Sequence, residues 1–250
     1  MKRNNLKIIG VIPARLESTR FPEKPLALIN GEEMILWVAR AAARAKNLSK
    51  LIIATDSEKI RDVAAKAGFA CEMTSRFCRS GSDRMCEVAL KTEGDIFINI
   101  QGDEPLIESE LIDSMAAPFL NNPEISVATA VAPLSAAQDY SNPDCVKVVF
   151  DKNMFALYFS RSPIPYFRNG KIEMDKIYKH IGIYAFTRQA LLDFTNTPKS
   201  DYEEAECLEQ LRLIENGVRI YCVKTGYISR GVDTASDLEH VIKIINEKKR

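Results

Sequence analysis

Three cationic side chains lie close together near the start of the chain, just after an apolar segment. Arg15, Arg20 and Lys24 fall within ten positions and follow the apolar residues 9–12. Three prolines interrupt the same segment, which blocks helix formation and holds the cations in an irregular loop. An open α/β sheet binds its ligand beyond the carboxyl ends of its strands, so this loop predicts a site for a polyanion such as a row of phosphate groups. The alternative is a charged loop that is only solvated.

The common phosphate-binding motifs are missing from the sequence. No G-x-x-x-x-G-K-[ST] segment occurs, and no G-x-G-x-x-G segment follows a predicted strand. The ATPase hypothesis and the usual dinucleotide-binding hypothesis therefore lose their main support.

Two aspartates are candidates for binding a divalent cation. Asp103 comes just after the apolar segment 96–100, which has the composition of a central strand buried on both faces. Its carboxylate is a hard oxygen ligand that suits Mg²⁺ bridging to phosphate oxygens. Asp233, in the segment 231–234, is the second candidate. The alternatives are that Asp103 only forms a turn and that Asp233 only caps the last helix.

A short polar segment at residues 80–84, Ser-Gly-Ser-Asp-Arg, opens a predicted helix. The first turn of a helix has free backbone N–H groups, and Gly81 lets a ligand approach the chain closely, so this segment is a candidate contact for a nucleotide. The alternative is an ordinary helix start in which Ser82 is the N-cap.

Other polar side chains are candidates for binding an acidic ligand. Arg161 ends a predicted strand, and its guanidinium can donate two parallel hydrogen bonds to a carboxylate. His180 precedes another predicted strand, with a buried structural histidine as the alternative. Glu209 and Gln210 lie on a predicted helix over residues 202–215.

The composition is that of a globular protein without an overall charge. The 250 residues include 34 basic and 34 acidic side chains, and 46% of them are hydrophobic. This allows a sizeable core in one large domain or two small ones. Zero net charge gives no general attraction for nucleic acid or for anionic membranes, so any anion binding must be local.

Cysteine usage and the N-terminal residues predict the cellular compartment. The six cysteines are scattered without a C-x-x-C pattern, and only two histidines could supplement them, so a zinc site is not expected. The N-terminus lacks the features of a secretory signal, and no segment reaches the ~18 apolar residues that a membrane span needs. The sequence predicts a cytosolic protein with reduced thiols.

Apolar segments alternate with helical patterns through the first half, as is typical of βαβ units. Strands are expected at residues 7–12, 50–55, 70–73 and 95–100, and helices at residues 34–45, 58–67, 83–91 and 109–120. Residues 55–58 are a capping-box candidate, and Gly68 is expected to end the helix that follows them.

The second half has more strand and less helix. Strands are expected at residues 126–132, 146–150, 156–159, 181–186 and 218–223, helices at 202–215 and from 235 onward, and a loop at 162–177. This pattern predicts a mixed α/β sheet in one compact domain, with a lobe built from the second half.

Several long motifs follow one another along almost the whole chain. In the first half they are Pro-Ala-Arg-x-x-Ser-Thr-Arg-x-Pro-x-Lys-Pro-Leu at 13–26, Ala-Thr-Asp at 54–56, Ser-Gly-Ser-Asp-Arg at 80–84 and Asn-x-Gln-Gly-Asp-Glu-Pro at 99–105. In the second half they are Ala-Leu-Tyr-Phe-Ser-Arg at 156–161, Lys-His-Ile-Gly-Ile-Tyr at 179–184, Leu-Glu-Gln-Leu-Arg at 208–212 and Gly-Val-Asp-Thr at 231–234. In this order they resemble the 3-deoxy-manno-octulosonate (Kdo) cytidylyltransferase family.

The resemblance implies a fold and a reaction. The fold would be a Rossmann-like α/β sheet of the nucleotide-diphospho-sugar transferase type, mixed but mostly parallel, with an inserted lobe for sugar binding and dimerisation. Residues 1–125 would mainly bind nucleotide, residues 126–230 would mainly bind sugar and form a homodimer, and residues 231–250 would form a metal loop and a terminal helix. The reaction would be Mg²⁺-dependent transfer of CMP from CTP to Kdo with release of pyrophosphate, in the cytoplasm, activating the sugar for lipopolysaccharide assembly.

The resemblance also implies site residues, by motif position. Catalytic roles fall to Arg15, Lys24, Asp103 and Asp233, and the two aspartates would bind Mg²⁺. The implied nucleotide-binding residues are Ala14, Arg15, Arg20, Lys24, Ser80, Gly81, Ser82, Arg84 and Gln101. The implied sugar-binding residues are Gln101, Arg161, His180, Tyr184, Glu209 and Gln210. Ser82 and Cys78 depart from the family, in which Thr and His are frequent at these positions.

Two further functions are alternatives. Cytidylyl transfer to 8-amino-Kdo or to a sialic acid would use a similar fold, although the Arg-x-Gly-Ser-Lys segment that is usual in the sialic acid enzymes is absent. A nucleotide-binding module without turnover is the alternative from another class. The presence of Lys24, Asp103 and Asp233 together argues against it, because a protein that only binds nucleotide does not need a paired metal site.

Overall fold

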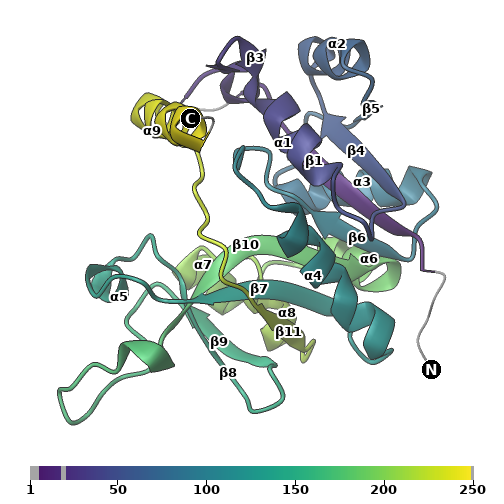
Figure 1. The fold of residues 1–250 in the computed structure, drawn as a ribbon. Helices are drawn as coiled ribbons and strands as arrows, with labels where there is room; N and C mark the ends of the chain where they lie inside the picture. Colours follow the sequence, from purple (N-terminus) through teal and green to yellow (C-terminus); the bar gives the residue numbers. More distant parts are fainter. Residues whose placement is uncertain (1–5, 18–20, 249–250) are drawn as a thin grey trace. The chain divides into compact units, whose positions relative to one another are not determined.

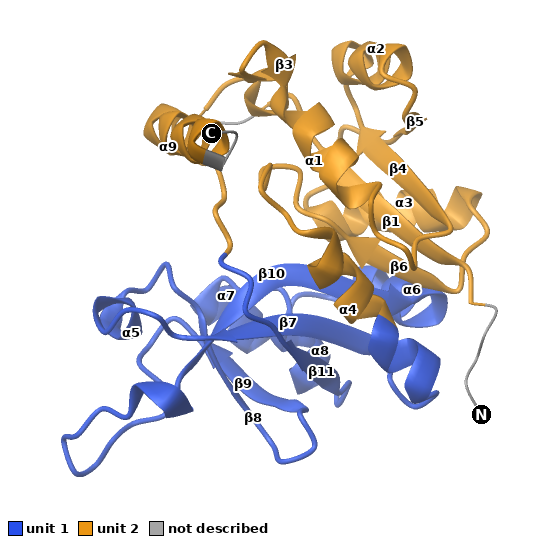
Figure 2. Ribbon diagram, in the orientation of Figure 1, with its two compact units in different colours: residues 1–4, 117–228 blue, residues 5–116, 229–250 orange. Residues whose placement is uncertain are grey.

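The computed structural model describes residues 6–17 and 21–248 (Figure 1). The chain divides into two compact units (Figure 2): unit 1 contains Ala117–Ile228, and unit 2 contains Asn5–Ala116 together with Ser229–Arg250. Unit 2 is therefore built from both ends of the chain. Within the described residues, none of the helices is long and apolar enough to span a bilayer.

Unit 2 is built on parallel strands whose carboxyl ends lie at one edge. Along this sheet the strands are β6 (Ile96–Asn99), β1 (Ile8–Ala14), β4 (Lys50–Thr55) and β5 (Ala70–Met73). The central strands are almost fully buried runs of Ile, Val and Phe, as expected for parallel strands covered on both faces. In the register, Ala14 pairs with Thr55, and Val11 pairs with Asn99. The loops after β1, β4 and β6 therefore start close together.

Helices cover this sheet, and the C-terminal helix packs against β2 and the start of α1. In Figure 1, α1 lies in front of the strands and α3 lies behind them. The helices of unit 2 are α1 (Met34–Ala42), α2 (Glu58–Lys66), α3 (Gly81–Lys91), α9 (Ala235–Lys248) and the first part of α4 (Ser109–Asn121). A short 3₁₀ turn, η1 (Lys24–Leu26), and the hairpin of β2 (Leu28–Ile29) with β3 (Glu32–Glu33) precede α1.

A buried cluster attaches the C-terminal segment to the N-terminal one. Val232, Val241 and Ile245 pack with Ile29 and Met34, and all five are at most 5% exposed. Burying side chains of this size contributes about 1.5–3 kcal/mol each. The cluster fixes where the loop before α9 lies in unit 2.

Unit 1 combines parallel and antiparallel pairing. Its strand β7 (Val127–Pro133) pairs in parallel with β11 (Ile220–Lys224) and antiparallel with β10 (Tyr178–Thr187). An antiparallel ribbon of β8 (Lys147–Phe150) and β9 (Ala156–Ser160) continues from β10. The remaining elements are α5 (Gln138–Ser141), η2 (Met174–Lys176), α6 (Arg188–Asn196), α7 (Asp201–Glu206) and α8 (Leu211–Glu215).

Most predicted elements are present, but several details of the prediction are wrong, and helix α5 and the hairpin of β2 with β3 were not predicted. The helix predicted over residues 202–215 is two helices, α7 and α8, because Cys207 adopts a left-handed conformation with φ 52°. His180 lies inside β10 rather than before a strand. The capping box predicted at residues 55–58 is absent, since Thr55 Oγ1 accepts from the Ser57 N–H and Ser57 caps nothing. Helix α6 was not predicted.

A buried ion pair holds the helices of unit 1 together. Arg212 on α8 donates from Nε and Nη2 to the two carboxylate oxygens of Glu203 on α7, at 2.6 and 2.5 Å. Its Nη1 donates to the carbonyls of Phe194 and Thr197 at the end of α6. The two charged side chains are 6% and 5% exposed. Removing one partner would leave an uncompensated buried charge.

We therefore expect Arg212→Met to lower the free energy of unfolding by about 3–5 kcal/mol, measured by urea denaturation. The double variant Arg212→Met/Glu203→Leu should recover much of this loss, because no charge is then left buried. Lys176→Met, which breaks an exposed pair with Glu173 in the same unit, is the matched control. A loss for Arg212→Met no larger than the control's would show that the buried pair does not support the packing of these helices.

Candidate active site

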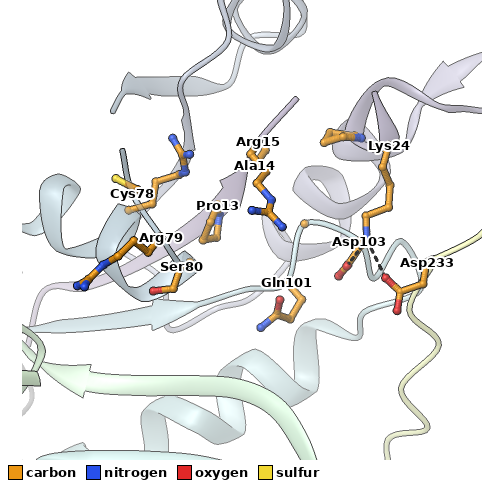
Figure 3. Close-up of a pocket in the computed structure, with 14 residues that line it drawn as sticks. Pro13, Ala14, Arg15, Lys24, Cys78, Arg79, Ser80, Gln101, Asp103 and Asp233 are labelled. Atoms are coloured by element: carbon orange, nitrogen blue, oxygen red, sulfur yellow. Dashed lines mark hydrogen bonds and ion pairs between the residues drawn. The ribbon is translucent and has the colours of Figure 1, made fainter. Parts of the chain in front are cut away.

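A cavity of about 310 Å³ opens at the carboxyl edge of the parallel strands, entirely within unit 2 (Figure 3). Loops after β1 and β6, the start of α3, the turn η1 and the loop before α9 all contribute to it. Its lining residues are Pro13, Ala14, Arg15, Lys24, Pro25, Cys78, Arg79, Ser80, Gly81, Arg84, Gln101, Gly102, Asp103 and Asp233. Four of them are cations and two are carboxylates, so the cavity suits an anionic ligand held with a cation.

One ammonium group joins the two carboxylates of the cavity. Lys24 Nζ lies 2.6 Å from Asp103 Oδ2 and 3.1 Å from Asp233 Oδ1. Figure 3 shows the lysine reaching between the two aspartates. The lysine side chain is 15% exposed, whereas Asp103 and Asp233 are 32% and 48% exposed. The two oxygens therefore converge on a single point that already holds one positive charge.

The backbone brings the two aspartates to this point. Gly102 packs so closely on the end of β1 that a Cβ atom there would lie 2.7 Å from the Pro13 carbonyl oxygen. The Val232 N–H donates to the Asp103 carbonyl at 2.9 Å, which joins the loop before α9 to the loop after β6. Both contacts are between backbones, so the distance between the carboxylates does not depend on flexible side chains alone.

At the start of α9 the capping hydrogen bonds are made by the side chains of Thr234 and Asp237. Asp237 Oδ2 accepts from the backbone N–H groups of Asp233 and Thr234, and Asp237 N–H donates back to Thr234 Oγ1. These bonds satisfy the orphan donors of the first turn. The alternative role of Asp233 as a helix cap is therefore taken by Thr234 and Asp237.

The opposite wall of the cavity is the loop before α3. Ser80, not Ser82, is the N-cap of α3, and its hydroxyl accepts from the Asp83 N–H at 3.1 Å. Arg84, 3% exposed, donates to Asp56 Oδ2 at 3.1 Å and also to Thr74 Oγ1. This arginine therefore ties the first turns of α3 to the residues that follow β4 and β5.

Cys78 lies on the same wall and is tied to α3. Its thiol donates to Glu87 Oε1 at 3.2 Å, and Glu87 Oε2 accepts from the Ser75 N–H at 2.8 Å. Burial, with the neighbouring Glu87 carboxylate, raises the pKa of the Cys78 thiol to about 11. The thiol is therefore neutral near pH 7 and is a weak nucleophile.

The structure brings most of the residues predicted for the nucleotide and the metal into this one cavity. They are Ala14, Arg15, Lys24, Ser80, Gly81, Arg84, Gln101, Asp103 and Asp233. Ser82 is buried within α3 and is absent from the lining, and Arg20 is outside the described residues. The lining also contains Pro13, Pro25, Cys78, Arg79 and Gly102, which were assigned no role. All five lie in or beside the quoted motifs.

Unit 1 holds the other predicted residues, and Arg161 there already has partners. Its Nε donates to the Glu206 carbonyl at 2.7 Å, and its Nη2 and Nη1 donate to the carbonyls of Cys207 and Pro143. The Glu206 carboxylate accepts from the Arg161 backbone N–H at 2.9 Å. A guanidinium has five N–H groups, so one on each terminal nitrogen remains for a ligand.

A buried lysine supports the backbone of Arg161. Lys147 Nζ donates to the Arg161 carbonyl at 2.5 Å and to the Asn142 carbonyl at 2.9 Å. The Lys147 side chain is fully buried, and burial lowers its pKa. In the register, Lys147 pairs with Ser160 on one side and with Lys179 on the other. Strand β8 therefore lies between β9, which ends just before Arg161, and β10, which contains His180.

His180 is a neutral side chain in this structure. Its Nε2 lies 2.9 Å from Thr129 Oγ1, and the Thr129 hydroxyl lies 2.9 Å from the Ile183 carbonyl. Since the hydroxyl has one hydrogen for the carbonyl, His180 Nε2–H is the donor to Thr129. Burial lowers the pKa of His180 to about 3. The imidazole can accept a hydrogen bond at Nδ1, but it provides no positive charge to a carboxylate.

Two more of the predicted residues carry buried polar atoms without a hydrogen-bond partner among the described residues. They are the Tyr184 hydroxyl and the Gln210 Nε2. Gln210 is 6% exposed, and the Tyr184 ring lies 5.3 Å from the His180 ring. Burial, with the charge of Glu209, raises the pKa of Tyr184. Leaving such a group unpaired costs about 1–3 kcal/mol, and the arrangement is typical of a site that pairs them with a ligand.

The sequence and the fold are similar to those of known cytidylyltransferases. A family model described as Cytidylyltransferase matches residues 9–220. Proteins named 3-deoxy-manno-octulosonate cytidylyltransferase are similar over nearly their whole length. The one from Chloroherpeton thalassium is 46% identical over 245 residues, or 97% of this chain and 99% of that protein. The one from Chlorobium phaeobacteroides is 47% identical over 244 residues, or 97% and 98%.

A solved structure of CMP:2-keto-3-deoxy-manno-octonic acid synthetase complexed with CTP is similar to this structure. The TM-score is 0.93 at 39% sequence identity, with 97% of this chain and 99% of the other covered. This likeness confirms the predicted fold class, a mixed α/β sheet of the nucleotidyltransferase type.

The neutrality of His180 can be tested directly, because the chain has only two histidines. In the variant His240→Gln, the one remaining imidazole should not titrate between pH 8 and pH 5 in NMR spectra, since burial lowers its pKa to about 3. An unfolded histidine titrates near ~6.5. Between these two pKa values the unfolded chain binds a proton that the folded chain does not bind. The free energy of unfolding should therefore fall as the pH drops from about 6.5 towards 3. An imidazole that titrates near pH 6.5 in the folded variant would contradict this.

Proposed function

The chain belongs to the 3-deoxy-manno-octulosonate cytidylyltransferase family, and on this basis we propose that it transfers CMP from CTP to Kdo and releases pyrophosphate. The observation that carries the proposal is the cavity of unit 2, in which cations and a pair of carboxylates meet beyond the ends of parallel strands. A nucleoside triphosphate held with a divalent cation matches this combination of charges. The product would serve lipopolysaccharide assembly, in the cytoplasm.

The reaction needs positioning and neutralisation of charge more than proton transfer. The anomeric hydroxyl of Kdo attacks the α-phosphorus in line, the bond to pyrophosphate breaks, and the hydroxyl proton is released. Negative charge grows on the departing pyrophosphate, so cations that contact it stabilise the transition state more than the ground state. Arg15 and Lys24 are the cavity residues that we assign to the triphosphate. Arg20, from the same motif, is assigned the same role.

The carboxylate pair fits Mg²⁺. Mg²⁺ is usually held by one or two carboxylates together with substrate phosphates and water, and Asp103 and Asp233 provide two hard oxygens that converge on one point. Among the described residues no cluster of three or more His, Cys, Asp or Glu side chains forms a self-sufficient metal site. When bound, Mg²⁺ would neutralise phosphate charge and favour ionisation of the attacking hydroxyl.

Unit 1 would bind the sugar acid. Arg161 has one N–H group on each terminal nitrogen left for the sugar carboxylate, and the buried polar atoms of Tyr184 and Gln210 would pair with its hydroxyl groups. Glu209 and His180 complete the proposed set in unit 1, and Gln101, which belongs to unit 2, is assigned to both substrates. We also propose that the protein is a homodimer that associates through unit 1. Exposed apolar side chains there, such as Leu157 and Tyr166, support this.

The proposal is tested by release of pyrophosphate from CTP in the presence of Mg²⁺ and Kdo. We expect turnover that requires all three components. Asp103→Asn and Asp233→Asn should each lower kcat by roughly 10²–10³, because each removes a charge that holds the cation at the reacting phosphate. Asp62→Asn, an exposed acid on α2, is the control and should keep normal turnover. Turnover only with 8-amino-Kdo or a sialic acid would show that Kdo is the wrong substrate assignment. The absence of turnover with any of these sugar acids would favour the alternative of a nucleotide-binding module.

Arg161→Lys should raise the KM for Kdo far more than the KM for CTP. A lysine cannot offer two parallel donors to a carboxylate, and the loss should be roughly 1.5–3 kcal/mol in kcat/KM for Kdo. Steady-state kinetics with each substrate varied in turn measures this. Arg168→Lys, which changes an exposed arginine of the same unit, is the control. A raised KM for CTP with an unchanged KM for Kdo would show that Arg161 contacts the nucleotide and not the sugar acid.

A further inference from the structure

Lys24 occupies the position to which both metal-binding carboxylates point. Its Nζ lies 2.6 Å from Asp103 Oδ2 and 3.1 Å from Asp233 Oδ1. Mg²⁺ binds carboxylate oxygens at about 2.0–2.1 Å, so a metal ion on these same two oxygens and the ammonium cannot occupy the point together. A metal ion nearby would also be repelled by the ammonium charge at very short range.

We propose that Lys24 is a resident counter-ion that keeps Asp103 and Asp233 closed to divalent cations until the triphosphate draws its ammonium away. The carboxylates become metal ligands in the same event that binds the nucleotide, so the metal enters with CTP and not before it. This inference rests on the proposed function, because it takes a triphosphate as the ligand that moves the lysine.

The local structure allows the ammonium to move while its backbone stays in place. Lys24 begins the turn η1, where the next residue, Pro25, is buried and has a restricted φ. The Lys24 N–H donates to the Phe21 carbonyl at 3.2 Å, and its carbonyl accepts from the Ala27 N–H at 3.1 Å. The side chain above this anchored backbone has four rotatable carbons and three donors. It can exchange carboxylate acceptors for phosphate oxygens within the same cavity.

The charges of the cavity favour this exchange. With Lys24 in place, the carboxylate pair and the ammonium together carry one negative charge. A triphosphate adds several negative charges beside Arg15 and Lys24, which gives the ammonium a stronger electrostatic partner than the aspartates. Once it leaves, the two carboxylates have lost the charge of the ammonium between them, and a divalent cation can replace it.

The experiment measures metal binding without substrate or turnover. Mn²⁺ is titrated into the substrate-free full-length protein, and free Mn²⁺ is followed by EPR. Lys24→Met should bind Mn²⁺ roughly tenfold more tightly than the wild-type protein, because removing one unit charge at such short range is worth about a power of ten even in polar surroundings. Lys24→Arg keeps the charge and should show no gain. Lys59→Met removes a nearby exposed lysine paired with Glu23 and is the matched control.

Three further measurements complete the test. The double variant Lys24→Met/Asp103→Asn should lose the gain, which shows that the added affinity is at the carboxylate pair. Lys24→Gln repeats the test in case the Met variant does not fold, which circular dichroism would show. In the wild-type protein, CTP should raise the affinity for Mn²⁺ by at least as much as removing the lysine does.

The inference is overturned if Lys24→Met and Lys24→Gln bind Mn²⁺ no more tightly than the wild-type protein. It is also overturned if Lys24→Arg gains affinity equally, since charge would then be irrelevant. Its failure is separable from failure of the proposed function. Wild-type turnover of CTP and Kdo with no metal gain in the Lys24 variants rejects only the counter-ion role, whereas a metal gain in a protein without turnover leaves the counter-ion role standing and rejects the reaction.

Discussion

The contact of the Lys24 ammonium with Asp103 and Asp233 is the interaction around which the cavity of unit 2 is arranged. It joins positions that are 79 and 209 residues apart in the chain. Two carboxylates this close would repel each other without a cation between them. The chain therefore needs a positive charge at this point whether or not a nucleotide is bound, and the lysine meets that need in the substrate-free protein. A site built in this way keeps its geometry in the absence of substrate.

Backbone contacts place the charges before the side chains interact. The close approach of Gly102 to the Pro13 carbonyl and the bond from Val232 N–H to the Asp103 carbonyl join the end of β1, the loop after β6 and the loop before α9 at one edge of the sheet. The buried cluster around Val232 then holds the last of these loops against the N-terminal segment. The C-terminal helix is thus part of the site's support, although it follows the rest of unit 2 by more than a hundred positions.

The elements of unit 2 could be predicted from sequence because their signals are local. Strand β4 and strand β5 have the predicted bounds, and Gly68 ends α2 with φ 81° as expected. From the residues alone the two carboxylates could be predicted only as separate candidates, and the family resemblance was needed to pair them, since no local pattern shows that Lys24 joins them. The N-cap of α3 is Ser80 and not Ser82, which the alternative interpretation named, because both serines fit the same rule. The functional roles of the site residues remain predictions.

The break between α7 and α8 could not be predicted, and it explains how Arg161 is held. The apolar spacing over residues 202–215 fits one continuous helix, and nothing in a cysteine side chain favours the left-handed conformation that Cys207 adopts. In a continuous helix the carbonyls of Glu206 and Cys207 would accept from backbone N–H groups four residues later. Because the helix ends there, these carbonyls accept from the Arg161 guanidinium instead. The break that the periodic pattern does not predict therefore orients Arg161. It also leaves Gln210 outside a helix, with a buried amide group that can hydrogen-bond to a ligand.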